Sequence, residues 1–156
     1  MKKIFFVLLL SLTIVGCDLF TDSTDNSTPL HKSITDNGIE FSVEIPTNNF
    51  SLYDTLSITF KVKNNSTLTK EFNFANMQQL AFQLIDKNNN VAMFYPYIVS
   101  PALSNFILNP GETKVLNQNS LFKHHSGNYI NKGNYILNTF LADNNSPKLK
   151  LDISVN

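Results

Sequence analysis

The 156-residue sequence predicts an all-β domain of about eight or nine short antiparallel strands. Two observations lead to this prediction. From residue 39 onward, apolar and polar residues alternate in short runs, which is typical of strands with one face in a core and the other in water. Clusters of Asn, Asp, Gly and Pro separate these runs and indicate turns. Many short strands joined in this way form a sandwich or a barrel.

The strand pattern is clearest where four apolar residues alternate with polar ones, as in 56–63 and 149–155. Residues 96–109 show no regular pattern apart from their aromatic and proline content, and 120–132 are expected to form a loop. The segments predicted as strands are 39–45, 56–63, 72–74, 80–84, 91–95, 113–117, 133–142 and 148–155.

Two motifs refine the architecture. Pro110 and Gly111 predict a turn, because proline presets φ and glycine allows a positive φ. Gly133 and Tyr135 enter a late strand as Gly-x-Tyr, a pattern similar to the tyrosine corner of Greek-key sandwiches. In that motif the phenol hydroxyl bonds to the backbone a few residues upstream. We therefore expect an immunoglobulin-like β-sandwich in preference to a barrel.

The first residues are typical of a bacterial lipoprotein signal peptide. Two lysines precede an apolar run over 4–15, which ends in Gly16-Cys17 and resembles a lipobox. The run is too short to span a membrane, which needs roughly 20 apolar residues. We expect cleavage after residue 16 and lipidation of Cys17, because two or three acyl chains anchor a protein durably. The domain then lies outside the cytoplasm in the cell envelope, with the inner and the outer membrane as alternatives.

Residues 17–36 are rich in Ser, Thr, Asp and Asn, a composition that buries too little apolar surface to fold. We expect a flexible tether over 17–36, followed by the β-sandwich domain over 37–156. Cys17 is the only cysteine of the chain, so no disulfide supports this domain. Its stability must come from the hydrophobic core.

Composition argues against nucleic-acid binding. After removal of two lysines with the signal peptide, ten basic residues face twelve acidic ones, a net charge of −2. A nucleic-acid-binding protein would carry a basic patch. No nucleic-acid partner is therefore expected, and the lipid on Cys17 makes a membrane the first predicted partner.

No pattern in the chain predicts an enzyme, a metal site or a cofactor site. His124 and His125 are adjacent, so on a strand they would point to opposite faces. Asp86 begins a run with the first spacings of a calcium loop, but Val91 stands where glycine is needed and Tyr97 where glutamate is needed. A hairpin turn is the preferred interpretation of that run. No nucleophile signature is present.

The segment 93–106 is the candidate protein-binding loop. Loops stiffened by proline lose little entropy on docking, and aromatic side chains dominate binding hot spots. The alternative is that these side chains close one end of the core. The residues proposed for contact are Tyr95, Pro96, Tyr97, Pro101 and Phe106.

The order of motifs over residues 39–142 resembles the BsuPI family, which is named for an intracellular proteinase inhibitor. No single motif is specific, and their order carries the resemblance. The chain lacks tryptophan, whereas the family usually has a Trp-rich segment before the Pro-Gly-Glu turn. The matching segments are 63–66, 71–74, 78–84, the turn led by Asp86, 108–112 and 133–135.

This resemblance implies an immunoglobulin-like sandwich and binding of a proteinase, with the loop over 95–106 and the loop over 124–127 making contact. We therefore expect a lipid-anchored envelope protein that binds another protein, with proteinase inhibition as the specific activity. A non-inhibitory structural or adhesive module is the alternative. Glycan binding is a third class, which would require exposed aromatic side chains with polar neighbours.

Overall fold

A computed structural model describes residues 29–143 and 145–156, so the expected signal peptide and Cys17 lie outside the described residues. The described chain forms eleven strands and no helix, which confirms the all-β prediction. The strands are β1 (Leu30–Asp36), β2 (Ile39–Ile45), β3 (Asn49–Phe50), β4 (Thr55–Asn64), β5 (Lys70–Phe74), β6 (Leu80–Asp86), β7 (Val91–Tyr95), β8 (Ser104–Leu108), β9 (Thr113–Leu121), β10 (Gly133–Leu141) and β11 (Leu149–Val155).

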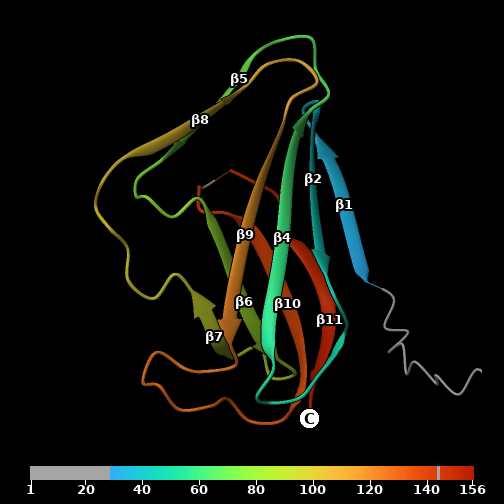
Figure 1. Ribbon diagram of the computed structural model, residues 1–156, viewed down its shortest axis with the longest axis vertical. Helices are drawn as coiled ribbons and strands as arrows, with labels where there is room; N and C mark the ends of the chain where they lie inside the picture. The colour runs from blue at the N-terminus through green and yellow to red at the C-terminus, as the bar shows by residue number, and fades with distance from the viewer. Residues whose placement is uncertain (1–28, 144) are drawn as a thin grey trace, which may run out of the picture.

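Two sheets form a sandwich of the immunoglobulin-like kind. One has the strand order β1-β2-β4-β9, and the other has the order β3-β11-β10-β6-β7. A separate antiparallel pair, β5 and β8, extends to one side of the sandwich (Figure 1). Every pairing is antiparallel except the short contact between β3 and β11.

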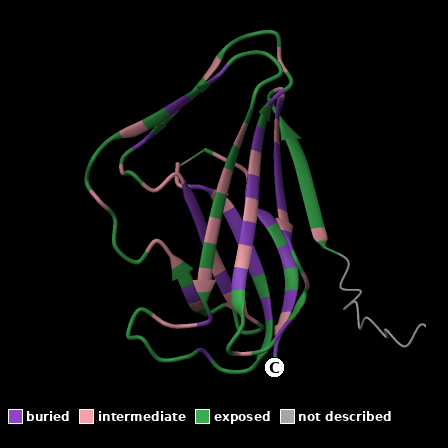
Figure 2. Cartoon of the chain, in the orientation of Figure 1, coloured by how far each residue is buried: buried purple, intermediate pink, exposed green. Residues whose placement is uncertain are grey.

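The core lies between the two large sheets and follows the alternation of the strands. In β4 the side chains of Leu56, Ile58, Phe60 and Val62 are buried, and the residues between them are partly accessible. Buried segments of β2, β4, β6, β10 and β11 face one another across the sandwich (Figure 2). Each such side chain stabilises the fold by about 1.5–3 kcal/mol relative to exposure. In the described chain, this core is the main source of stability.

The prediction of a tether over 17–36 is wrong for its last part, because Leu30–Asp36 forms β1. This strand pairs with β2 along its whole length. The connection is the dipeptide Asn37-Gly38, whose φ angles of 50° and 79° suit a two-residue hairpin turn. The side chains of β1 are nearly all exposed (Figure 2), so the strand has no alternation to reveal it. Backbone pairing with β2 holds it in the sheet, together with Leu30, whose partly buried side chain packs against the core.

Two further strands differ from the prediction: β8 was not expected, and β9 is longer than expected. Residues 96–109 were expected to be irregular, but Ser104–Leu108 forms β8, which pairs with β5. The strand expected over 113–117 continues to Leu121 as β9. Most residues of its second half are polar, which hides the alternation, and no residue of β9 is fully buried.

Both structural motifs have the predicted geometry. The backbone N–H of Glu112 donates to the carbonyl of Asn109 at 3.0 Å, and Gly111 has a φ of 83°, so residues 109–112 form the expected turn. The hydroxyl of Tyr135 donates to the backbone carbonyl of Asn131 at 2.5 Å, which is the contact of a tyrosine corner. Gly133 begins the strand β10 that carries this tyrosine.

Candidate functional site

The connection between β7 and β8, residues 96–103, displays apolar side chains to solvent. Ile98 is 85% exposed and Leu103 is 84% exposed, and Val99 between them is also exposed. Single exposed apolar residues are common on protein surfaces, but several in one short segment indicate a contact surface. We call residues 96–103 the β7–β8 loop. It lies at the side of the sandwich, below the β5–β8 pair (Figure 1).

The β7–β8 loop is held against the segment 76–79. The backbone N–H of Ser100 donates to Oε1 of Gln78 at 3.2 Å, and the carbonyl of Ser100 accepts from Met77 at 3.4 Å. The hydroxyl of Ser104 donates to the carbonyl of Asn76 at 2.7 Å. These contacts limit the conformations of the loop, so its apolar side chains are presented on a supported backbone.

The structure separates the predicted contact residues into two groups. Tyr97 is 38% exposed, its ring lies 5.0 Å from that of Phe94, and its hydroxyl donates to the carbonyl of Lys123. Pro101 is exposed and Pro96 is half-buried. Tyr97 and Pro101 therefore lie on the accessible surface and Pro96 is accessible in part, and their role as contact residues stays a prediction.

Tyr95 and Phe106 belong to the packed interior instead. Tyr95 is half-buried and stacks on Phe82, with ring centroids 5.8 Å apart. Phe106 is only 8% exposed and stacks on Phe72 at 4.6 Å, because β8 turns this residue inward. The prediction that Phe106 is a contact residue is therefore wrong, and for this residue the core-closing alternative holds.

Sequence reasoning did not single out the exposed aliphatic residues of the loop, Ile98, Val99 and Leu103, because it weighted aromatic side chains. A usable signal existed. The residues lie in an apolar stretch around Pro101 that has no strand or helix periodicity, and such a stretch has no regular way to bury its side chains.

The second predicted contact segment, His124–Gly127, forms a tight turn. The N–H of Gly127 donates to the carbonyl of His124 at 2.9 Å, and Gly127 has a φ of 87°. Nearby, the ammonium of Lys123 lies 4.6 Å from the ring centroid of Tyr129. The bond from Tyr97 to Lys123 joins this turn region to the β7–β8 loop, so the two predicted segments share one surface.

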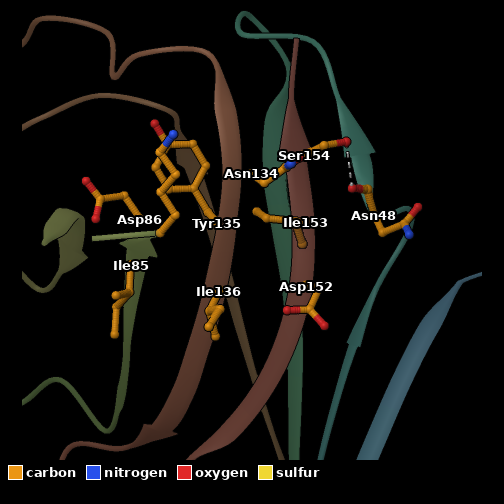
Figure 3. Close-up of a pocket in the computed structure, with 10 residues that line it drawn as sticks. Asn48, Ile85, Asp86, Asn134, Tyr135, Ile136, Asp152, Ile153 and Ser154 are labelled. Atoms are coloured by element: carbon orange, nitrogen blue, oxygen red, sulfur yellow. Dashed lines mark hydrogen bonds between the residues drawn. The ribbon is translucent and has the colours of Figure 1, made fainter. Parts of the chain in front are cut away.

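A separate groove of about 550 Å³ crosses the outer face of β6, β10 and β11. Figure 3 shows Ile85 of β6 beside Ile136 of β10, with Asp152 and Ser154 on the neighbouring strand β11. The groove is shallow. Within the described residues, no three His, Cys, Asp or Glu side chains come close enough to hold a metal ion.

Asp86, at the end of that groove, organises the β6–β7 turn. Its Oδ1 accepts from the backbone N–H groups of Asn88 and Asn90 at 2.8 and 2.9 Å, and Asn89 has a φ of 62°. The hydrogen bond from the backbone of Asn90 lowers the pKa of Asp86 from its ordinary value. This carboxylate is already engaged, as the hairpin interpretation predicts.

No family model matches the chain, and no curated protein matches it. A β-glucosidase from Erythrobacter marinus is similar over 82% of this chain, at 12% identity and a TM-score of 0.48. A β-glucosidase from Listeria innocua in complex with glucose is similar over 84%, at 14% identity and a TM-score of 0.44. The chain covers only 16% of either glucosidase.

The CARDB domain of the PF1109 protein from Pyrococcus furiosus is similar over 81% of this chain and 93% of its own length, at 15% identity and a TM-score of 0.41. Identity and TM-score are too low in all three cases for an activity to be transferred. The part of the chain that the structure describes has no helix long and apolar enough to cross a membrane.

Proposed function

We propose that this chain is a lipid-anchored protein of the bacterial cell envelope whose β-sandwich binds another protein through the β7–β8 loop. The observation that carries this proposal is the exposure of Ile98 and Leu103 on a loop that hydrogen bonds hold in place. Inhibition of a proteinase is the specific activity that we propose for this binding.

The energetics of the loop support a contact role. Burial of Ile98 and Leu103 in a partner would contribute about 3–6 kcal/mol, since each side chain contributes about 1.5–3 kcal/mol. That range corresponds to roughly two to four orders of magnitude in affinity. The bonds to Gln78 and Met77 reduce the entropy that the loop would lose on binding.

The inhibitory version of the proposal has two supports. A proteinase binds extended apolar segments, and a loop braced by its scaffold can occupy that cleft while keeping its own conformation. The motif order shared with the BsuPI family points to the same activity. The β7–β8 loop lies inside the region of that resemblance.

Lipidation of Cys17 would tether the sandwich to a membrane. Twelve residues, 18–29, lie between the cysteine and β1, and they can span at most about 40–45 Å. We propose that the partner is an envelope protein within that reach.

Binding is tested with a chain of residues 18–156, which retains every described residue and the complete core cluster. A double variant, Ile98→Ser with Leu103→Ser, removes the apolar contact without touching the core. The matched control is Leu68→Ser on another loop, where the side chain is 68% exposed. Circular dichroism confirms folding of all three proteins.

Each protein is used to capture partners from envelope extract and is incubated with serine, cysteine, aspartic and metallo-proteinases. We expect one envelope protein to be retained by the native chain and by the Leu68→Ser control but lost by the double variant. We also expect the native chain to slow one proteinase while remaining uncleaved. Equal capture by all three proteins would refute the contact surface, and no inhibition in any class would refute the inhibitory activity.

A further inference from the structure

β9 is an open edge of its sheet. It pairs with β4 on one side, and the described chain places no strand on its other side. Figure 1 shows β9 at one edge of that sheet and β1 at the other, with β9 running beside β4 along most of its length. Nine consecutive residues, Thr113–Leu121, stay in register with β4 without a bulge.

The register identifies the free backbone groups of β9. The N–H of Asn64 donates to the carbonyl of Glu112 at 2.9 Å, so at this position of the ladder the backbone groups point toward the partner strand. In an antiparallel pair such residues alternate with residues whose N–H and C=O point away. The outward N–H and C=O groups therefore belong to Thr113, Val115, Asn117 and Asn119. Those of Thr113, Val115 and Asn117 make no hydrogen bond within the described chain.

One end of the edge is partly closed by its own side chain. Nε2 of Gln118 donates to the carbonyl of Asn119 at 2.7 Å. The open part is therefore Thr113 to Asn117. Its only charged residue, Lys114, is opposite the buried Val62 and so faces the inner side of the sheet.

Open edges are usually blunted by charged side chains, proline, bulges or short length, because they attract other strands. β1, the other edge of the same sheet, resembles β9 in having neither a proline nor a bulge, but it is two residues shorter. Two edges of the other sheet are blunted more clearly. The pairing of β6 with β7 has a register shift between Leu84 and Ile85, and β3 is only two residues long. β9 is the longest edge strand in the described chain, and it has neither a proline nor a bulge.

A hollow of about 390 Å³ lies beside the middle of this edge. Leu116 lines it from β9, and Leu80 and Tyr95 line it from the opposite sheet. The hollow exists because β7 ends at Tyr95, opposite Phe82, which leaves Leu80 without a partner on the β7 side of β6. Met77 also lines it and bonds to Ser100, so the hollow adjoins the β7–β8 loop.

We propose that the Thr113–Asn117 edge of β9 binds an extended polypeptide segment by strand addition, with one apolar side chain of that segment in the adjoining hollow. An extended chain presents alternating donors and acceptors at the spacing of the free groups on β9. Its side chains alternate between the two faces, so every second one points toward the hollow. The inference deepens the proposed function by naming how a protein partner is held, and it uses residues outside the β7–β8 loop.

The test uses Val115→Pro, which removes an outward N–H that takes no part in pairing with β4 and places proline where edge strands tolerate it. Val115→Ala is the matched control, because it shortens the side chain and keeps the N–H. The probes are synthetic decapeptides taken from a random phage-displayed library selected on the native 18–156 chain. Affinities are measured by calorimetry, and amide hydrogen exchange of the native chain is measured with and without peptide.

We expect selected peptides to protect the amides of Val115 and Asn117 from exchange and to bind Val115→Pro at least tenfold more weakly than Val115→Ala. The exchange measurement needs no variant, so it decides the question even if Val115→Pro is unstable. Failure to select any peptide, or peptides that leave these amides unprotected, would overturn the inference. A homodimer abolished by Val115→Pro would also overturn it, because the edge would then belong to a second copy.

The outcome separates this inference from the proposed function. Peptides that bind the Ile98→Ser, Leu103→Ser variant normally but lose affinity for Val115→Pro would support strand addition even if the loop captures no envelope protein. A partner that needs the loop but binds Val115→Pro as tightly as the native chain would leave the proposed function intact and refute strand addition.

Discussion

The tyrosine corner offers a test of the fold at a single atom. Tyr135→Phe removes the hydroxyl that donates to Asn131 and keeps the buried ring in place. A hydrogen bond of this kind contributes about 0.5–1.5 kcal/mol net. We therefore expect a loss of about 1 kcal/mol in the free energy of unfolding, which corresponds to roughly 3–6 °C in Tm for a domain of this size.

Urea unfolding followed by circular dichroism measures this loss. The control is Tyr53→Phe, because Tyr53 is 70% exposed and its hydroxyl makes no hydrogen bond within the described residues. The control is expected to match the native chain within about 0.5 kcal/mol. If Tyr135→Phe is as stable as the native chain, or if both variants lose the same amount, the hydroxyl does not stabilise the corner.

The pH dependence of the same variant provides a second measurement. Burial, with a smaller contribution from Asp86, raises the pKa of Tyr135 above its ordinary value of 10.0. The folded state thus holds the phenol proton more tightly than the unfolded state. The hydroxyl's stabilisation is complete below pH 10.0 and is lost as the pH rises through the folded pKa. The native chain and Tyr135→Phe should therefore converge in stability above that pH.

Three further predictions follow from the residues described above. Phe106→Ala should lower the free energy of unfolding by about 3–5 kcal/mol, whereas Ile98→Ser should change it by less than about 0.5 kcal/mol, as measured in urea. Gly38→Ala should cost about 1–3 kcal/mol in the same assay, because φ is 79° and the added Cβ would lie 2.9 Å from that of Ser66. Cys17→Ser should move the protein from the membrane fraction to the soluble fraction of cells, and an unchanged distribution would refute lipid anchoring.

The sequence feature that predicted strands correctly was the alternation of apolar and polar residues, which arises where one face of a strand is buried. β2, β4 and β11 alternate because one face of each packs in the core, and this alternation is visible in the residues themselves. β1 escaped prediction because neither of its faces is substantially buried. The dipeptide Asn37-Gly38 was the available signal, since it favours a two-residue hairpin and implies a strand on each side.

Of the residues predicted to make contact, Tyr97 and Pro101 are exposed and Phe106 is buried. The segment 93–106 contains the β7–β8 loop, and the pairing of β8 with β5 removes Phe106 from it. That pairing joins residues more than thirty positions apart, such as Phe72 and Phe106. Local periodicity carries little information about a strand partner so far along the chain. The buried Phe106 could therefore not be distinguished from the exposed Tyr97 by sequence alone.

The sequence by itself determined the all-β class, the turn at Pro110-Gly111 and the tyrosine corner, because each depends on residues close together in the chain or on burial of one strand face. Only the tertiary structure decided that β9 is an open edge, that a hollow adjoins it, and that Ile98 and Leu103 are exposed. These features depend on where distant strands end relative to one another. The pairing of strands across the whole chain sets them, and no local pattern of residues encodes them.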